Sequence, residues 1–275
     1  MEVGRWITGR STPLPYSASF YEKIVTKSRR SAREVVPVLV DLFRPSSVVD
    51  VGCGTGSWLA VFQALGVDVT GYEGPWIGSA DLDVAKHLII EHDVTTGIPS
   101  RRTFDLVLSL ETAEHLPKSA ATGFVKSLVD LGPVIVFSAA VPRQGGTDHR
   151  NEEWPSGWVE LFAHHHYVAI DCLRPMFWAN DAVSWWYAQN MLLFVRRDRL
   201  LLYEHLAHKA VSPIGTALPL IHPRNYLALH SALDEANKRA DLSQRGCSEL
   251  IVAFPAAAQR AITARLRRVL RSPSK

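Results

Sequence analysis

Three side chains that could hold a metal ion or move a proton lie close together in the stretch ETAEHLP. They are Glu111, Glu114 and His115, at positions i, i+3 and i+4. On a helical turn, side chains at this spacing converge on one face. Two carboxylates and an imidazole so placed favour a cation between them: oxygen ligands suit Mg²⁺ or Mn²⁺, and a histidine favours Mn²⁺ or a later transition metal. The spacing therefore indicates a site for a divalent cation.

A second kind of site is indicated by a glycine-rich stretch, VVDVGCGTGSW, at Val48–Trp58. Glycines at alternate positions allow φ > 0 and let a ligand lie against the backbone. The helix that follows points its first N–H groups at that ligand. The G-x-G-x-G spacing differs from the G-x-G-x-x-G of dinucleotide-binding folds. Asp50, two residues before the first glycine, disfavours a pyrophosphate and suits a cationic amine or sulfonium.

Acidic residues also end the other predicted strands. Glu73 closes DVTGYE, and Asp93 follows His92 just beyond the next strand. Ligands of open parallel sheets bind beyond the carboxyl ends of the strands. A carboxylate at the end of the second strand can accept both hydroxyl groups of a ribose. These positions therefore favour a nucleoside-containing ligand.

The D-x-G-x-G-x-G pattern at a strand end resembles the first motif of class I S-adenosylmethionine-dependent methyltransferases. The resemblance implies that the adenine amino group lies near Asp93 and His92. Glu73 stands where an aspartate is common, so only the geometry at the ribose differs. The implied S-adenosyl-L-methionine-binding residues are Asp50, Gly52, Cys53, Gly54, Gly56, Trp58, Glu73, His92, Asp93 and Glu111.

The E-x-x-E-H pattern resembles the metal site of small-RNA 2′-O-methyltransferases and of ubiquinone-pathway O-methyltransferases. In those families a histidine from the loop after the fifth strand completes the site, and His149 is the matching residue here. The resemblance implies that Glu111, Glu114, His115 and His149 bind Mg²⁺ or Mn²⁺, with His149 and Glu114 catalytic. In the metal-free alternative, Glu111 orients the cofactor and His149 is a general base, contributing roughly 10²–10⁴-fold.

The elements that position these residues are short apolar segments that alternate with helical patterns. This alternation predicts an α/β fold: a Rossmann-like, seven-stranded, mostly parallel sheet with helices on both faces. The strands are expected at 48–51, 68–72, 87–91, 104–110, 133–138, 167–173 and 190–196, the last two pairing as a hairpin. Helices are expected at 56–65, around 81–85, at 116–131 and around 155–165.

Three parts of the chain are expected. Residues 1–44 form an N-terminal lid and accessory helix, with Tyr16, Phe20 and Tyr21 either covering the cofactor or stapling the helix. Residues 45–197 form the S-adenosylmethionine-binding core. Residues 198–275 form a C-terminal helical extension. Its last helix carries a basic face, which we expect to be exposed to solvent. The helices of the extension could also form a homodimer contact.

Composition limits the partners. The net charge of +3 is too small to argue for nucleic acid, and no apolar run reaches the roughly 18 residues of a membrane span. The three cysteines are scattered, as expected of a cytoplasmic protein.

The motif order from residue 16 to 200 also resembles a bacterial group of methyltransferase-domain proteins associated with secondary metabolism or glycan assembly. We therefore expect a metal-assisted O-methyltransferase acting on a sugar or polyhydroxylated small molecule. The alternatives are a metal-independent N-, C- or carboxyl-methyltransferase and a non-catalytic cofactor-binding scaffold.

Overall fold

The structure is a computed structural model that describes residues 18–75, 77, 81–99, 102–203, 206, 210–211, 220–243, 260 and 263–264. The proposed lid residue Tyr16 lies outside these ranges, as do the side chains of Phe20 and Tyr21. Contacts between Cα atoms divide the chain into two compact units, residues 1–222 and residues 223–275. The predicted boundary at residue 198 thus falls within the first unit.

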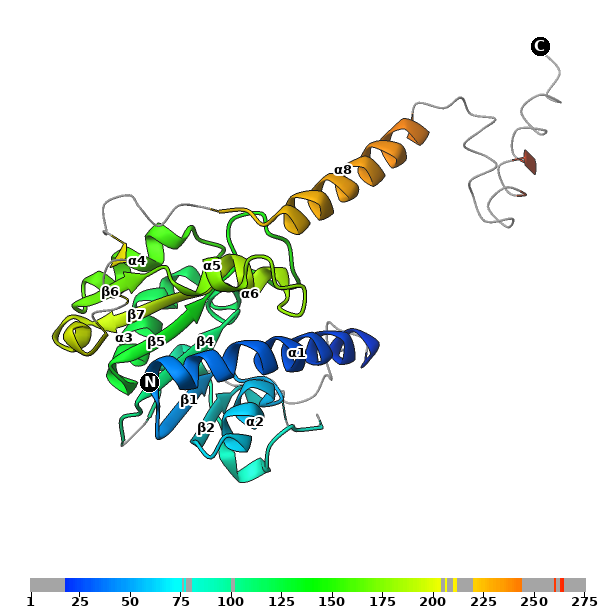
Figure 1. Ribbon diagram of the computed structural model, residues 1–275. Helices are drawn as coiled ribbons and strands as arrows, with labels where there is room; N and C mark the ends of the chain where they lie inside the picture. The colour runs from blue at the N-terminus through cyan, green and yellow to red at the C-terminus, as the bar shows by residue number, and fades with distance from the viewer. Residues whose placement is uncertain are drawn as a thin grey trace, which may run out of the picture. The chain divides into compact units, whose positions relative to one another are not determined.

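An eight-stranded sheet forms the centre of the first unit, in the order β3-β2-β1-β4-β5-β7-β6-β8 (Figure 1). Its strands are β1 (Ser47–Val51), β2 (Asp68–Glu73), β3 (Ile89–Glu91), β4 (Leu106–Leu110), β5 (Val134–Ser138), β6 (Tyr167–Ile170), β7 (Leu192–Arg196) and β8 (Ala210–Val211). The first five strands are parallel, and β7 is antiparallel to both β5 and β6. The seven predicted strands are confirmed, and the two-residue β8 adds an eighth beside β6.

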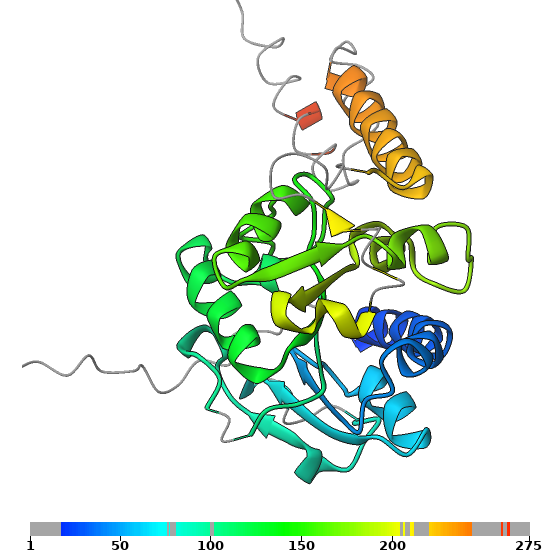
Figure 2. The same ribbon diagram turned by 60° about the vertical axis from the view of Figure 1, so that its left-hand side comes forward.

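Helices cover both faces of this sheet, as predicted. One face packs against α1 (Ala18–Phe43), α2 (Ser57–Ala64), α5 (Leu173–Phe177) and α6 (Trp185–Asn190). The other packs against α3 (Ala121–Leu131) and α4 (Pro155–Ala163). Figure 2 shows the sheet between these two layers. Because side chains alternate along a strand, successive β4 residues enter opposite cores: Leu106 and Leu108 one, Val107 the other.

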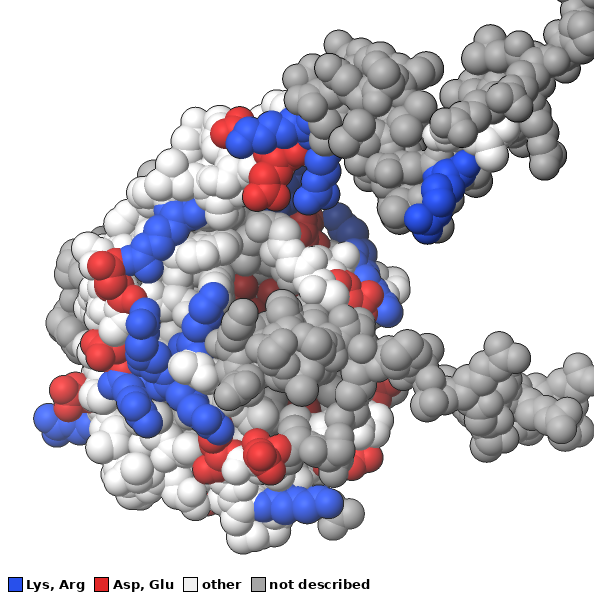
Figure 3. All heavy atoms as spheres, turned by 90° about the vertical axis from the view of Figure 1, so that its right-hand side faces the viewer, with Lys and Arg blue, Asp and Glu red and all other residues white. Residues whose placement is uncertain are grey.

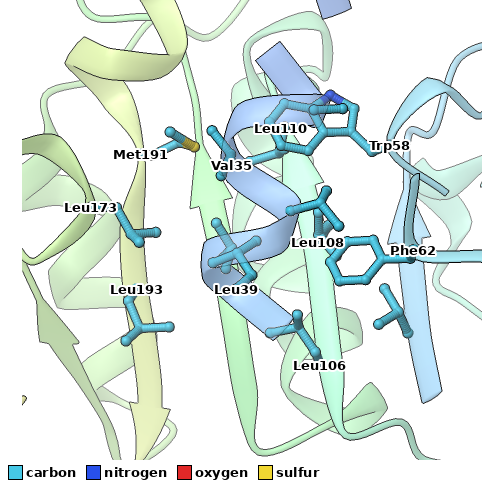
Figure 4. Close-up of a cluster of buried hydrophobic side chains, with 14 of the residues drawn as sticks. Val35, Leu39, Trp58, Phe62, Leu106, Leu108, Leu110, Leu173, Met191 and Leu193 are labelled. Atoms are coloured by element: carbon cyan, nitrogen blue, oxygen red, sulfur yellow. The ribbon is translucent and has the colours of Figure 1, made fainter. Parts of the chain in front are cut away.

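The long helix α1 packs on the face of the sheet that carries Leu108 of β4 and Leu193 of β7 (Figure 4). Val35 and Leu39 are fully buried in the same cluster as Leu108 and Leu193. This packing holds the helix that precedes the first strand against the sheet.

The predicted helix 116–131 begins later than expected, at Ala121. Two 3₁₀ turns precede it, η4 (Ala113–His115) and η5 (Lys118–Ala120). Pro117 explains the interruption, because a proline pushes the residue before it out of the helical region, and Leu116 is extended at φ −81°, ψ 151°.

Other boundaries also shift. The prediction of a helix around 81–85 is wrong, because these residues form no helix. A 3₁₀ turn, η2 (Lys86–Leu88), follows them and delays the start of β3. Likewise β6 ends at Ile170 and β7 begins at Leu192. The short turn η3 (Val94–Thr96) follows β3, and η6 (Arg197–Tyr203) replaces the start of the helix expected after residue 198.

The second unit contains α8 (Pro223–Ser243), which confirms one helix of the predicted extension. Most of its described side chains are exposed, including Tyr226, Leu227 and Leu233. The basic helix expected at 255–271 lies outside the described residues except for 260, 263 and 264. Within the described part of the chain, no helix is both long and apolar enough to cross a bilayer.

Candidate cofactor and metal site

The glycine-rich turn joins β1 to α2 at the carboxyl edge of the sheet. Gly52, Gly54 and Gly56 all have positive φ, and Gly56 is the N-cap of α2. A Cβ atom on Gly52 would overlap the side chain of Thr112. The turn therefore packs directly against the segment that carries Glu114 and His115, so a ligand on the turn lies beside that segment.

Asp50 lies beneath this turn with an unsatisfied carboxylate. Its side chain is 2% exposed, and its Oδ1 has no hydrogen-bond partner among the described residues. Burial, and then the negative charge of Glu73, raise the pKa of Asp50 to about 8. A buried carboxylate is stabilised in its charged form by a positive partner, so a cationic group that reached Asp50 would bring its pKa down again.

Glu73 ends β2 and binds the glycine turn itself. Its Oε2 accepts a hydrogen bond from the Gly54 N–H at 2.7 Å, and its Oε1 accepts one from the Gly74 N–H at 2.8 Å. The carboxylate predicted to contact a ribose thus also holds the turn in place. Each oxygen of Glu73 already accepts one main-chain hydrogen bond. A ribose hydroxyl would therefore have to donate to an oxygen that also holds a main-chain N–H, or replace that N–H.

The remaining predicted cofactor residues occupy varied positions. Asp93 is exposed and caps η3, accepting hydrogen bonds from the Thr95 N–H at 2.9 Å and hydroxyl at 2.7 Å. His92 contacts the Gly97 carbonyl through Nε2 at 2.5 Å. Cys53 and Trp58 are buried, and the Trp58 ring packs edge-on against Tyr187 at 5.1 Å.

Three of the four predicted metal ligands converge. Glu114, His115 and His149 each offer a ligand atom, and these atoms all lie within 4.8 Å of one another. Glu114 and His115 share η4, whereas His149 comes from the loop after β5. The two imidazole rings meet edge to face, with centroids 5.0 Å apart.

Main-chain hydrogen bonds hold the His149 loop against η4. The Glu114 carbonyl accepts from the Arg150 N–H at 2.7 Å and from the Asn151 N–H at 3.0 Å. A Cβ on Gly146, at φ 155°, would overlap the His149 ring. Gly146 therefore leaves room for the imidazole.

A carboxylate orients His149. Its Nδ1 lies 2.9 Å from Glu152 Oε1, and Glu152 Oε2 accepts a hydrogen bond from the Arg143 N–H at 2.6 Å. Histidines that bind metals commonly hold a carboxylate with the other ring nitrogen, which fixes the tautomer and raises ligand basicity. The arrangement leaves Nε2 as the free nitrogen of His149 for a metal or a proton.

The electrostatics of the cluster favour an added cation. Glu114 is 1% exposed, and its Oε2 has no partner in the described part of the chain. Burial, and then the charge of Glu111, raise the pKa of Glu114 well above its ordinary value. Burial and then His149 lower the pKa of His115. Each group therefore favours its neutral form, and a cation would offset the cost of keeping Glu114 charged.

Glu111 lies outside this group of three ligands. It follows β4 at φ 52°, so it does not continue into the helical turn assumed from the spacing. Its Oε1 accepts a hydrogen bond from Asn190 Nδ2 at 3.1 Å, and its Oε2 accepts one from Gln144 Nε2 at 3.2 Å. Burial is the largest cause that raises the pKa of Glu111, and these donors oppose it.

These donors belong to a buried amide network that sequence reasoning missed. Gln189 Nε2 donates to Gln144 Oε1 at 3.0 Å, and Asn190 Nδ2 donates to the same oxygen at 2.9 Å. All three amide side chains are less than 10% exposed. The Gln189-Asn190 pair directly before the apolar β7 was the available signal, since polar residues there must find buried partners.

The site lies at the edge of the sheet where the parallel strands end. In Figure 1 the β7 arrow points left, and β5 is antiparallel to β7, so the parallel strands end toward the right-hand side. Figure 3 views this face directly. Acidic atoms appear at the bottom of a hollow near its middle, whereas lysine and arginine side chains lie on the surrounding surface. Acidic side chains thus lie within the hollow and basic ones on the surface around it.

Comparison with known proteins places this geometry in a family. The family model described as "Methyltransferase domain" matches residues 24–183. The ubiquinone biosynthesis O-methyltransferase of Rhodopseudomonas palustris (strain BisB18) is 28% identical over 149 residues, covering 50% of this chain and 52% of that protein. The protein of the same description from Colwellia psychrerythraea is 32% identical over 107 residues, covering 35% and 42%. The chain thus spans about half the length of these relatives.

A solved structure is also similar. The magnesium protoporphyrin IX methyltransferase of Synechocystis PCC 6803 with bound SAM is 18% identical, with a TM-score of 0.47 over 66% of this chain and 86% of that one. The family match, however, spans more than half of the 275 residues. The chain therefore belongs to the methyltransferase-domain family, within the class I S-adenosylmethionine-dependent methyltransferases that its glycine motif resembles.

Proposed function

We propose that the chain transfers the methyl group of S-adenosylmethionine to a hydroxyl oxygen of a small polyhydroxylated acceptor, such as a catechol or a sugar, with the help of a divalent cation. One observation carries this proposal: Glu114, His115 and His149 converge on the segment against which the glycine turn packs. The turn would hold the methyl donor, and the three ligands would hold the acceptor oxygen beside it.

The cofactor half of the proposal rests on Asp50 and the turn. The Asp50 Oδ1 atom, which has no hydrogen-bond partner among the described residues, suits the cationic end of S-adenosylmethionine. The first N–H groups of α2 point toward the same ligand. Glu73 would serve the ribose and Asp93 the adenine, as their positions after β2 and β3 suggest.

The metal half rests on donor chemistry. Glu114, His115 and His149 would hold Mg²⁺ or Mn²⁺, while Glu111 contributes negative charge nearby and stays bound to Asn190 and Gln144. A bound divalent cation would lower the pKa of an acceptor hydroxyl and fix its orientation. Glu152 keeps His149 turned so that Nε2 is the free nitrogen.

The reaction itself is a single displacement. The acceptor oxygen forms a bond to the methyl carbon as the carbon–sulfur bond breaks, leaving the neutral thioether S-adenosylhomocysteine and releasing the hydroxyl proton. Alignment of the two substrates can supply roughly 7–11 kcal/mol of the barrier reduction. The chain contributes by fixing the donor on the turn and the acceptor on the convergent side chains.

A second candidate is a metal-independent transfer to nitrogen, carbon or a carboxylate. The hydrogen bond between His149 and Glu152 favours it, because an imidazole held by a carboxylate is also a good general base. The two candidates differ in whether a cation is needed.

Binding measurements separate these candidates. Isothermal titration of Mn²⁺ should give a site in the wild-type protein that Glu114→Gln and His149→Ala each weaken. His164→Ala is the matched control, because His164 is an exposed histidine at the C-terminal end of α4 and does not belong to the cluster. If neither Glu114→Gln nor His149→Ala affects Mn²⁺ binding, the metal half of the proposal is wrong.

Transfer is tested with methyl-labelled S-adenosylmethionine and a panel of catechols and sugars. Incorporation should disappear in EDTA and return with Mg²⁺ or Mn²⁺. Transfer that persists undiminished in EDTA and requires His149 supports the metal-independent candidate instead.

A further inference from the structure

Asp83 lies in the segment that follows β2, and its carboxylate binds two other parts of the chain at once. Its Oδ2 accepts hydrogen bonds from the Ser57 hydroxyl at 2.6 Å and from the Thr55 hydroxyl at 3.0 Å. Its Oδ1 accepts a hydrogen bond from Arg29 Nε at 2.7 Å. Thr55 and Ser57 flank Gly56 in the glycine-rich turn, whereas Arg29 belongs to α1. One carboxylate thus joins the turn to α1.

The main chain of the same segment also lies against the turn. The Asp83 N–H donates to the Thr55 carbonyl at 2.8 Å. A Cβ atom on Gly56, which has φ 84°, would lie 2.7 Å from Cγ2 of the buried Val84. Gly56 is the N-cap of α2, and no side-chain hydrogen bond caps this helix. Residues 83 and 84 therefore support the turn where α2 begins.

The Asp83 carboxylate is stabilised in its charged form. Its side chain is 12% exposed, whereas that of Arg29 is 45% exposed. Burial opposes ionisation of Asp83, but the hydrogen bonds from Arg29, Ser57 and Thr55 outweigh it, so the pKa of Asp83 is lowered from its ordinary value. Hydrogen bonds to an ionised acceptor are roughly twice as strong as those between neutral groups. The contacts of Asp83 with the turn therefore restrain it more firmly than neutral hydroxyl contacts would.

This restraint does not use the groups that would contact a cofactor. Asp83 Oδ2 binds side-chain hydroxyls, so its hydrogen bonds leave aside the main-chain N–H groups at the start of α2. A ligand that lies against a glycine-rich turn contacts its main chain. Its affinity is higher when the free turn already holds the conformation of the complex, because less ordering is needed on binding.

From these contacts we propose that Asp83 is a positioning residue for the methyl donor. Through Thr55 and Ser57 it holds the glycine-rich turn in the conformation that binds S-adenosylmethionine, and Arg29 holds Asp83 in place. The inference rests on the proposed binding of S-adenosylmethionine by this turn. It adds a residue that lies in neither the glycine motif nor a strand end.

Asp105 provides a matched control. Its Oδ2 accepts hydrogen bonds from the Ser46 N–H at 2.9 Å and the Ser47 N–H at 3.0 Å. Ser47 begins β1, whereas the glycine-rich turn follows the end of the same strand. Asp105 therefore binds the opposite end of β1. Its replacement shows whether the loss of any hydrogen-bonded aspartate near this strand weakens cofactor binding.

The test is isothermal titration with S-adenosylmethionine, at a temperature at which circular dichroism shows each protein to be folded. Asp83→Ala should weaken binding by at least about tenfold, equivalent to about 1.4 kcal/mol. Asp83→Asn keeps one acceptor oxygen and should weaken binding less; it carries the test if Asp83→Ala does not fold. Asp105→Ala should lower the melting temperature and leave the affinity unchanged.

A double-mutant cycle tests whether Asp83 acts through the turn. Ser57→Ala removes the shorter of the two hydroxyl hydrogen bonds. In the variant that also carries Asp83→Asn, the loss of affinity should be smaller than the product of the two single losses, because both changes remove the same contact.

Unchanged affinity in the Asp83 variants, an equal loss in Asp105→Ala, or single losses that multiply fully in the double variant would overturn the proposal while the proposed function stands. If the wild-type protein does not bind S-adenosylmethionine, the proposed function fails, and the role of Asp83 fails with it.

Discussion

Replacing Asp50 with asparagine should stabilise the free protein at high pH while weakening cofactor binding. The folded-state pKa of Asp50 is about 8, raised from 3.8 by burial and by Glu73. Asp50 ionises near pH 4 in the unfolded chain but only near pH 8 in the folded protein. Between these pH values the unfolded chain gains a charge that the folded protein resists, so folding becomes less favourable. The contribution of Asp50 is therefore fully present below about pH 4 and lost as the pH rises through about 8.

The size of this loss follows from the difference between the two pKa values. At about 1.4 kcal/mol per pH unit, a pKa raised from 3.8 to about 8 sets an upper bound of about 6 kcal/mol. Water reaching the carboxylate through the glycine turn would reduce the loss, so we expect about 2–4 kcal/mol. Asparagine has no charge to lose and should escape this effect.

Urea denaturation between pH 5 and pH 9 measures this contribution. The free energy of unfolding of Asp50→Asn, minus that of the wild type, should grow as the pH rises and level off above about pH 8. Asp130→Asn, an exposed aspartate on α3, is the control and should show no such growth. Calorimetry should show weaker S-adenosylmethionine binding to Asp50→Asn. A stability difference that does not change with pH would show that Asp50 does not ionise with a raised pKa, and unchanged cofactor affinity would show that it does not contact S-adenosylmethionine.

Three further predictions concern the core, the metal ligands and the amide network. Leu39→Ala should lower the free energy of unfolding by about 2–5 kcal/mol in urea, because Leu39 is fully buried under the sheet, whereas the exposed Leu201→Ala should change it little. Glu152→Gln should weaken Mn²⁺ binding by about 10–100-fold with little effect on folding, since it removes the carboxylate that orients His149; unchanged Mn²⁺ affinity would contradict this role. Asn190→Ala should lower the free energy of unfolding by about 1.5–3 kcal/mol, because Asn190 Nδ2 donates to the Glu111 carboxylate. The loss should be smaller in a Glu111→Gln background, where the acceptor is uncharged. Equal losses in both backgrounds would show that the charge of Glu111 does not strengthen this hydrogen bond.

The sheet could be predicted from the sequence because its signal is local. Apolar runs such as those of β4 and β5 are buried on both faces, and the glycines at 52, 54 and 56 mark the turn. The carboxyl ends of neighbouring parallel strands lie at the same edge of a sheet. Asp50 on β1 and Glu73 on β2 are therefore close together.

The details of the E-x-x-E-H stretch could not be predicted from spacing. The i, i+3, i+4 argument assumes one helical turn, but Glu111 adopts a positive φ and Pro117 interrupts the helix. The cluster forms instead because η4 presents Glu114 and His115 together. Convergence of His149 depends on hydrogen bonds to the Glu114 carbonyl, which no local pattern encodes.

The amide network was hidden for a different reason. Gln144 and Asn190 are far apart in sequence, and each resembles an ordinary surface residue when it is considered alone. Only the long-range pairing of β5 with β7 brings them together around Glu111. Polar residues that end buried strands are the places where such partners should be sought.

We propose that the methyl donor lies beside a metal ion bound by Glu114, His115 and His149. The most direct measurement is the NMR signal of S-adenosylmethionine carrying a ¹³C-labelled methyl group, bound to the protein and titrated with Mn²⁺. Mn²⁺ should strongly broaden the bound methyl signal by its paramagnetism. Mg²⁺ should leave the signal sharp, and the broadening should be lost in His149→Ala and Glu114→Gln. A bound methyl signal that stays sharp with Mn²⁺ would show that the metal ion does not lie beside the methyl donor.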